Sequence, residues 1–144
     1  MTFPGNPPII SVVPDIPMER LTLFAKALSD PTRVRILWML RGRRLCVCEI
    51  GDALGVPQSS LSTHLQGLRT AGLVDAEKER TWAYYSLQEW VGPMLERLDG
   101  QFLQGAEPVF EQDAARLQAR LKMREGGCCV VGYGQLIQIG EKRK

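Results

Sequence analysis

Residues 56–86, VPQSSLSTHLQGLRTAGLVDAEKERTWAYYS, decide the fold. In the first half of this stretch, leucines recur with the i, i+4, i+7 spacing of one face of an α-helix: Leu61, Leu65 and Leu68. A turn at Ala71-Gly72 follows, and two short segments, residues 73–76 and 82–86, then flank the charged loop 77–80. The stretch therefore predicts a helix and, after it, a β-hairpin.

The face of the predicted 57–70 helix that lies opposite the leucines is polar but nearly uncharged. Serine, threonine and glutamine side chains project together there at about 100° per residue: Ser59, Ser62, Thr63, Gln66 and Thr70. An ordinary solvated face carries Glu and Lys pairs, whereas short hydroxyl and amide side chains suit a face that approaches phosphates and base edges. The free N–H groups after Pro57 also suit a phosphate oxygen. We therefore expect this helix to contact DNA.

The segments before this helix predict three more helices. Residues 48–55, CEIGDALG, form a short helix that ends at its final glycine, and a Gly-Val-Pro turn joins it to the next helix as a helix-turn-helix. Upstream, Asp30-Pro31 provides an N-cap and a first-position proline for a helix over 32–40. That helix is apolar nearly all round, so we expect it to be the central buried helix. A first helix is predicted over 18–28.

This order of motifs, over roughly residues 20–100, resembles the winged helix-turn-helix of the ArsR/SmtB family of metal- and metalloid-responsive repressors. Residues 27–37, ALSDPTRVRIL, match the usual lead-in of that family. The resemblance implies a mainly α-helical fold with a small β-hairpin, or wing. It also implies a homodimer that is held through its terminal helices and binds a roughly palindromic double-stranded operator.

The resemblance places the DNA contacts on the 57–70 helix and near the tip of the wing. The residues expected there are Gln58, Ser59, Ser60, Ser62, Thr63, His64, Gln66, Arg69, Lys78 and Arg80. His64, the single histidine, lies at the border of the leucine stripe, so a packing role and a DNA contact are both open.

Composition narrows the class of protein. The chain has 144 residues and a net charge of +2, which suits one domain with tails. It contains neither a run of 18 apolar residues nor a basic segment followed by an apolar core at its start, so neither a membrane span nor a secretory signal is expected. We therefore expect a cytoplasmic protein, in which four cysteines favour metal, metalloid or redox chemistry over structural disulfides.

Two of these cysteines, Cys46 and Cys48, lie at the start of a predicted helix. Within a regular helix, residues two apart point about 200° away from each other, but at a helix start the first cysteine can remain non-helical, which lets both thiols approach a common centre. The helix N-terminus and the basic residues at positions 41–44 favour thiolates, the form that binds soft ions. Ligand binding would then distort the first turn of a helix that supports the DNA-contacting helix.

The segment LCVC resembles the trivalent-arsenic site of arsenic-responsive family members. Those members offer a third cysteine three positions after the second, where this chain has Gly51. The adjacent Cys128 and Cys129, in the glycine-rich tail, are candidates for the missing ligand, from the same chain or its partner, or for a second site. The predicted metalloid ligands are therefore Cys46, Cys48, Cys128 and Cys129, with trivalent arsenic or antimony as the inducer and no organic cofactor.

Other uses of the cysteines stay open. They could form a disulfide in a redox-responsive regulator, or all four could bind zinc. The histidine- and carboxylate-rich zinc sites of other family members are disfavoured, because this chain has one histidine. A thiol enzyme is disfavoured because the chain lacks a second proton-handling histidine and a glycine-rich cofactor motif, so we expect no enzymatic activity.

The chain is expected to divide into four parts. Residues 1–17, which hold five of the nine prolines, form an extended arm, and residues 18–104 form the DNA-binding domain. A helix over 87–103, which Pro93 opens or kinks, ends that domain. Residues 105–125 carry a helix from Pro108 to Arg124 with an apolar stripe of Phe110, Ala114, Leu117 and Leu121. We favour dimerisation over core packing for this stripe. Residues 126–144 form a cysteine-containing flexible tail.

Overall fold

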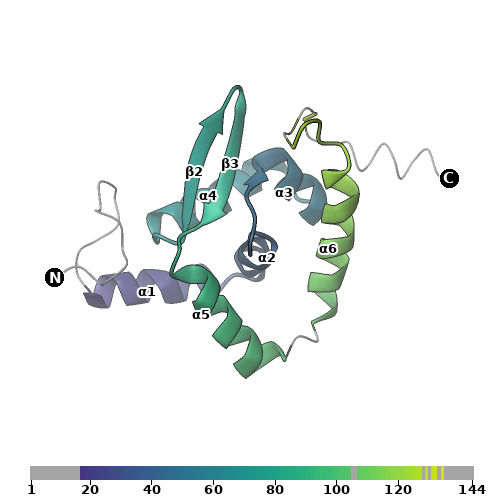
Figure 1. Cartoon of the computed structure of the whole chain (residues 1–144). Helices are drawn as coiled ribbons and strands as arrows, with labels where there is room; N and C mark the ends of the chain where they lie inside the picture. The colour runs from purple at the N-terminus through teal and green to yellow at the C-terminus, as the bar shows by residue number, and fades with distance from the viewer. Residues whose placement is uncertain (1–16, 105–106, 128, 130, 133, 135–144) are drawn as a thin grey trace.

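The structure, a computed structural model, describes residues 17–104, 107–127, 129, 131, 132 and 134. Its elements follow in the order α1 (Pro17–Leu28), α2 (Pro31–Met39), β1 (Leu45–Cys46), α3 (Val47–Leu54), α4 (Gln58–Thr70), β2 (Val74–Glu79), β3 (Trp82–Leu87), α5 (Val91–Leu98), the π-helical turn η1 (Asp99–Leu103) and α6 (Pro108–Leu121). Figure 1 shows α2 at the centre, with the other helices around it and the β2–β3 hairpin projecting away. The predicted winged helix-turn-helix is confirmed. The arm predicted over residues 1–17 lies outside the described residues, except for Pro17.

The local signals in the sequence set the helix ends. Asp30 caps α2, because its carboxylate accepts hydrogen bonds from the backbone N–H groups of Thr32 and Arg33 at 2.7 and 3.3 Å. Gly55 ends α3 in the left-handed region, with a φ of 71° that favours glycine. Pro57 then lies in extended geometry before α4. The turn between the two helices therefore forms as predicted.

The hydrophobic core surrounds α2. Ile36 and Leu37 of that helix are fully buried, which confirms α2 as the central helix. All three leucines of the α4 stripe are buried, and they belong to the same cluster as the apolar residues of α3 and α5. Helix α4 is thereby held through one face, and its polar face is left outward.

The wing is a three-stranded antiparallel sheet with the order β1-β3-β2. The two-residue strand β1 was not predicted, and it pairs Leu45 with Tyr85 and Cys46 with Tyr84. Strand β2 extends through Glu79, so the charged segment 77–79 was wrongly predicted as a loop. Cross-strand pairing overrides the weak strand propensity of the charged residues 77–79, and a strand of two residues is too short to show an alternating pattern. The turn instead contains Arg80, which has a φ of 59°.

The chain after the wing departs from the predicted single helix over 87–103. Helix α5 begins only at Val91, so Pro93 lies in its first turn, where a proline is tolerated. At Asp99 the helix passes into the π-helical turn η1, and the Asp99 carboxylate accepts a hydrogen bond from Trp38 Nε1 at 3.1 Å. This bond ties the end of α5 to the central helix.

Helix α6 packs against α3 and α2 of its own chain (Figure 1). Leu117 of its apolar stripe is buried, and Phe110 stacks on Trp38 with ring centroids 5.1 Å apart. These residues are therefore used within the chain, and dimerisation through α6 stays a prediction. The helix ends at Leu121, before the predicted Arg124.

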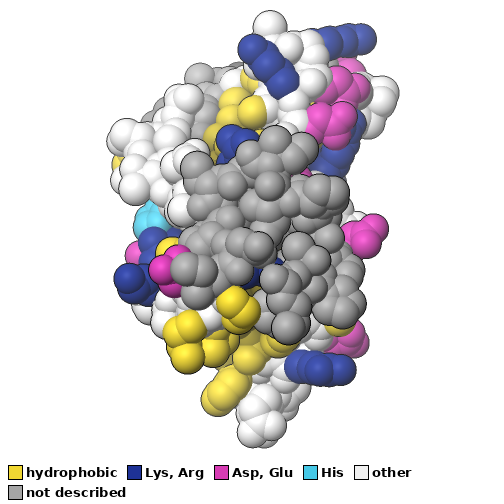
Figure 2. All heavy atoms as spheres, turned by 90° about the vertical axis from the view of Figure 1, so that its left-hand side faces the viewer, with side chains coloured by type: hydrophobic (Ala, Val, Ile, Leu, Met, Phe, Trp, Pro, Cys, Tyr) yellow, Lys and Arg dark blue, Asp and Glu magenta, His cyan; other side chains and the backbone are white. Residues whose placement is uncertain are grey.

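The large exposed apolar residues of the described chain do not lie on α6. The large exposed ones among the described residues are Met18 and Leu21 of α1 and Phe102 of η1. Figure 2 faces the side of the molecule on which α1 lies and shows hydrophobic side chains gathered in its lower half. Within the described part of the chain, no helix has the length and apolar character needed to cross a membrane.

Candidate nucleic-acid interface and cysteine centre

The outward face of α4 carries the predicted DNA-contacting residues. The side chains of Gln58, Ser59, Ser60, Ser62, Thr63, Gln66 and Arg69 are all exposed. Lys78 and Arg80 are exposed on the wing. Two separate elements therefore present polar and basic groups to solvent, which is the arrangement that a helix in the major groove and a wing against the phosphate backbone require.

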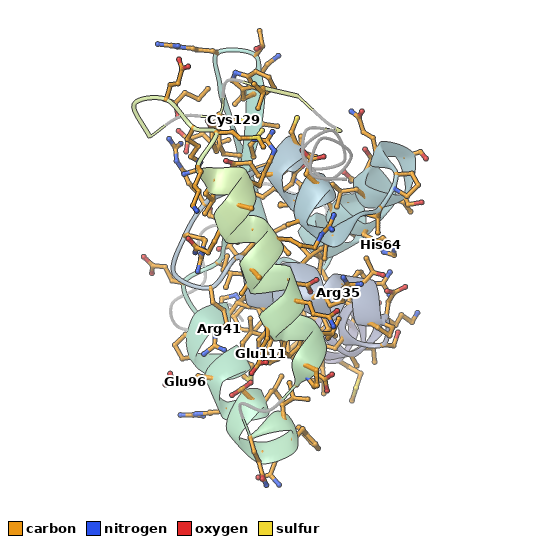
Figure 3. All side chains as sticks on the ribbon, turned by 90° about the vertical axis from the view of Figure 1, so that its right-hand side faces the viewer. Arg35, Arg41, His64, Glu96, Glu111 and Cys129 are labelled. Atoms are coloured by element: carbon orange, nitrogen blue, oxygen red, sulfur yellow. The ribbon has the colours of Figure 1, made fainter. Side chains whose placement is uncertain are left out.

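His64 occupies an intermediate position on α4. It is half-buried, and its Nδ1 atom is buried without a hydrogen-bond partner among the described residues. Figure 3 shows His64 on α4, well away from Cys129 at the upper end of α6. The histidine therefore does not belong to the cysteine centre.

Three cysteines form a buried cluster with Tyr84. The described thiols, Cys46, Cys48 and Cys129, are free, and each is at most 6% exposed. Cys46, Cys48 and Cys129 belong to one buried cluster, and the Cys46 thiol is close enough to the other two to influence their pKa values. The structure thus brings a tail cysteine to the predicted pair within one chain. Cys128 lies outside the described residues.

The geometry of the first two cysteines follows the prediction. Cys46 precedes α3 with φ −69° and ψ 147°, which is extended backbone, while Cys48 lies in the first turn of the helix. The backbone N–H of Cys129 donates a hydrogen bond to the Tyr84 hydroxyl at 2.8 Å. Because Tyr84 is also the strand partner of Cys46, the same residue contacts both sides of the cluster.

The three thiols do not form a ready-made metal site. Across the described residues, no group of three or more His, Cys, Asp or Glu side chains is arranged to hold a metal ion. Three thiols are nevertheless the soft donor set that a thiophilic ion prefers. A ligand would therefore have to reorient the three cysteine side chains. A distortion of the first turn of α3 would allow Cys46 and Cys48 to do so.

The thiols differ in acidity. The interaction with the neighbouring Cys46 thiol lowers the pKa of Cys48 even though burial opposes this shift, and the same interaction, together with burial, raises the pKa of Cys46. Burial, with the neighbouring Cys46, raises the pKa of Cys129 to about 11. Of the three described thiols, Cys48 is therefore the first to become a nucleophilic thiolate as the pH rises.

A row of three arginines, two on α6 and one just after it, contacts α3 along its whole length, and the sequence analysis missed it. Arg116 donates to the backbone carbonyls of Ala53 and Asp52, both at 2.8 Å, near the C-terminus of α3. Arg124, beyond the end of α6, forms a bidentate ion pair with the buried Glu49, with N–O distances of 2.6 and 2.7 Å. Arg120, between them, pairs with the Asp52 carboxylate. The i, i+4, i+8 spacing of these arginines was the signal available in the sequence.

Glu49 connects this row to the cysteine centre. Its Oε1 atom accepts a hydrogen bond from the backbone N–H of Cys46 at 2.8 Å, and the same oxygen accepts one from Arg124. The carboxylate therefore caps the first turn of α3 at the residue that bears the first thiol. A movement of the Cys46 backbone would therefore alter its hydrogen bond to Glu49 and, through Glu49, the ion pair with Arg124 just after α6.

Comparisons with known proteins agree with this fold. Residues 30–76 match the family model described as bacterial regulatory protein, arsR family. The arsenical resistance operon repressor of Bacillus subtilis is 33% identical over 105 residues, which cover 72% of this chain and 85% of that protein. The transcriptional repressor SmtB of Mycobacterium tuberculosis is 39% identical over 88 residues, which cover 61% of each chain.

Solved structures give the same result. HlyU from Vibrio cholerae matches with a TM-score of 0.56 and 33% identity, covering 62% of this chain and 98% of that one. A homodimeric winged helix-turn-helix DNA-binding domain from Mycobacterium bovis matches with a TM-score of 0.52 and 31% identity, covering 56% of this chain and 75% of that one.

Proposed function

The chain belongs to the ArsR family of bacterial regulatory proteins, whose members are DNA-binding transcriptional regulators and not enzymes, and we propose that its inducer is trivalent arsenic or antimony. In this proposal, the ion binds Cys46, Cys48 and Cys129, and the repressor then releases its operator. The observation that carries the proposal is the buried cluster of these three free thiols at the start of α3. The name of the Bacillus subtilis relative, an arsenical resistance repressor, supports it.

Thiol chemistry selects this class of ion. Trivalent arsenic and antimony are soft and form bonds to three sulfurs, whereas hard cations prefer oxygen ligands. Cys48, whose pKa is lowered, attacks first. Each thiol that joins replaces one hydroxyl of arsenite and releases one water, so three thiols convert arsenite to a neutral tris-thiolate. Binding therefore adds no net charge to a buried site.

Two structural connections couple the site to DNA. Cys46 and Cys48 lie at the start of α3, which packs against α4. Cys46 also pairs with Tyr84 of the wing strand β3. A ligand that distorts this turn shifts both DNA-contacting elements. A coupling free energy of about 1–3 kcal/mol would weaken operator affinity roughly 5- to 150-fold.

The DNA-bound form is a homodimer in this proposal. The exposed face of each α4 enters a major groove of a palindromic operator, and Lys78 and Arg80 of each wing lie near phosphates. The homodimeric Mycobacterium bovis domain supports this assembly. The protein would act in the cytoplasm, where the operator DNA is.

The test is operator-fragment binding with and without arsenite. Wild-type protein should release the fragment, whereas Cys46→Ser, Cys48→Ser and Cys129→Ser should bind it normally and fail to release it. Cys128→Ser is the matched control, because the proposed site uses only Cys129 from the tail. Normal release by both Cys46→Ser and Cys48→Ser would overturn the proposal.

A redox response is a second candidate, because the Cys46 sulfur lies near two other thiols. An oxidant such as peroxide would remove two electrons and two protons to join Cys46 to Cys48 or Cys129 as a disulfide. Release of DNA by peroxide, reversed by a thiol reductant and without any arsenite response, would favour it. Metal analysis of the purified protein tests the four-cysteine zinc alternative.

A further inference from the structure

Arg120 is the most buried cation among the described residues. Its side chain is 0% exposed, and its Nε atom donates to Asp52 Oδ2 at 2.7 Å. The Asp52 side chain is itself only 5% exposed. A buried ion pair of this kind contributes little to stability compared with apolar side chains of similar volume. Its presence in the core therefore calls for another explanation.

The other side of the guanidinium holds the C-terminal segment. Arg120 Nη2 donates to the backbone carbonyls of Val131 and Gly132 at 2.7 and 3.2 Å and lies 3.9 Å from the Cys129 sulfur. The second oxygen of Asp52 accepts a hydrogen bond from the backbone N–H of Gly134 at 2.7 Å. The ion pair thus contacts the Cys129 sulfur and three residues that follow it, and these contacts fix the segment to α3.

The arginine, which lies beside the Cys129 thiol, also carries one donor group that these contacts do not use. Its Nη1 atom is buried and has no hydrogen-bond partner among the described residues. An unpaired buried donor costs free energy, which is hard to account for if the residue serves packing alone.

We propose that Arg120 is a positioning residue that fastens the C-terminal segment to α3, and that it thereby sets the number of sulfurs at the cysteine centre. With the segment fastened, Cys129 lies beside Cys46 and the centre has three sulfurs. Without it, only Cys46 and Cys48 are left. The positioning role stands on the contacts above, whereas its consequence for the inducer rests on the proposed function.

The first arm of the test uses no inducer. In a Cys128→Ser background, Cys129 is the single tail thiol, and its rate of alkylation by iodoacetamide is followed by peptide mass spectrometry on the full chain. Arg120→Met should raise that rate at least about tenfold, because a segment held by few contacts then opens freely. Arg120→Lys, which keeps the charge but not the planar fork, should give an intermediate rate.

Arg116→Met is the matched control, since Arg116 holds α3 through Asp52 and Ala53 carbonyls one helical turn earlier. It should leave the alkylation of Cys129 unchanged. Operator binding by the reduced apoprotein verifies that each variant is folded. Should Arg120→Met fail to fold, the double variant Asp52→Asn/Arg120→Met removes both buried charges and takes its place. An unchanged alkylation rate in a folded Arg120 variant would overturn the proposal.

The second arm counts the thiols that arsenite protects from alkylation. Three are expected in the Cys128→Ser protein and two in Cys128→Ser/Arg120→Met. Three protected thiols in both proteins would overturn the claim about sulfur number. Protection of no thiol in either protein would contradict the proposed inducer, while the positioning role would still be decided by the first arm.

Discussion

Helix α4 turns Ser62, Thr63 and Gln66 outward, whereas the arginines of α6 point inward onto α3. These three side chains of α4 are polar, uncharged and exposed to solvent. On α6 the charge of Arg120 is buried and paired. If α4 contacts DNA as proposed, the difference teaches that charge alone does not identify a functional surface. The face proposed to meet the anionic partner is nearly uncharged, and the charged side chains of α6 form ion pairs and hydrogen bonds inside the protein.

The largest effect on stability is expected from disrupting the buried ion pair that α6 forms with α3. Asp52→Ala leaves Arg120 buried without its counter-ion, so the free energy of unfolding should fall by about 3–5 kcal/mol. Denaturant unfolding measures this decrease. Glu79→Ala, which removes the partner of Arg44 at the surface, should have a much smaller effect. Equal decreases in the two variants would contradict a buried framework role.

On the α4 side, the effect should appear in DNA binding and not in stability. Gln66→Ala removes an exposed amide from the polar face of α4. Operator affinity should fall by about 1–3 kcal/mol, the range for a good base contact. The free energy of unfolding should change by less than about 0.5 kcal/mol, as for most surface substitutions. Fluorescence anisotropy with operator and scrambled fragments measures both affinity and specificity. Unchanged specificity would mean that Gln66 contacts the DNA phosphate backbone and not a base.

The wing should contribute a smaller effect that does not depend on sequence. Lys78→Ala removes one exposed cation from β2. It should weaken binding to operator and scrambled DNA alike, and the slope of log affinity against log salt should become shallower by about 1 for each phosphate that is no longer neutralised. A salt titration of each fragment checks this. An unchanged slope would mean that the Lys78 ammonium group does not lie near a phosphate.

The smallest effect concerns the acidity of the thiols. Because the pKa of Cys48 is lowered and that of Cys129 is raised to about 11, the thiolate of Cys48 forms at lower pH. The alkylation rate of Cys48 should therefore rise with pH before that of Cys129. In the unfolded chain the two profiles should coincide. Profiles that coincide in the folded protein would show that the contact with Cys46 does not set the acidity of Cys48.

The sequence predicted what depends on neighbours along the chain. Asp30, Gly55 and the leucines of α4 act within one or two helical turns, and their roles are confirmed. The extended geometry of Cys46 at the helix start is likewise a local property.

The features that the sequence did not predict depend on distant contacts. Strand β1 exists because Cys46 pairs with Tyr84, and two residues carry no periodic signal of their own. The pairing of Arg120 with Asp52 joins positions 68 residues apart. The position of Cys129 beside Cys46 of the same chain depends in turn on the path of α6, which returns the chain to α3. Residue spacing alone could not separate this arrangement from a ligand donated by a partner chain.

The return of Cys129 to its own chain changes how inducer binding responds to dilution. Its thiol reaches Cys46 as a tethered group at a high effective concentration, without a second molecule. In the proposed repressor, operator binding requires two copies of the chain, whereas the three thiols of the cluster all come from one. Dilution below the dissociation constant of the dimer should therefore abolish DNA binding and leave the affinity for arsenite unchanged.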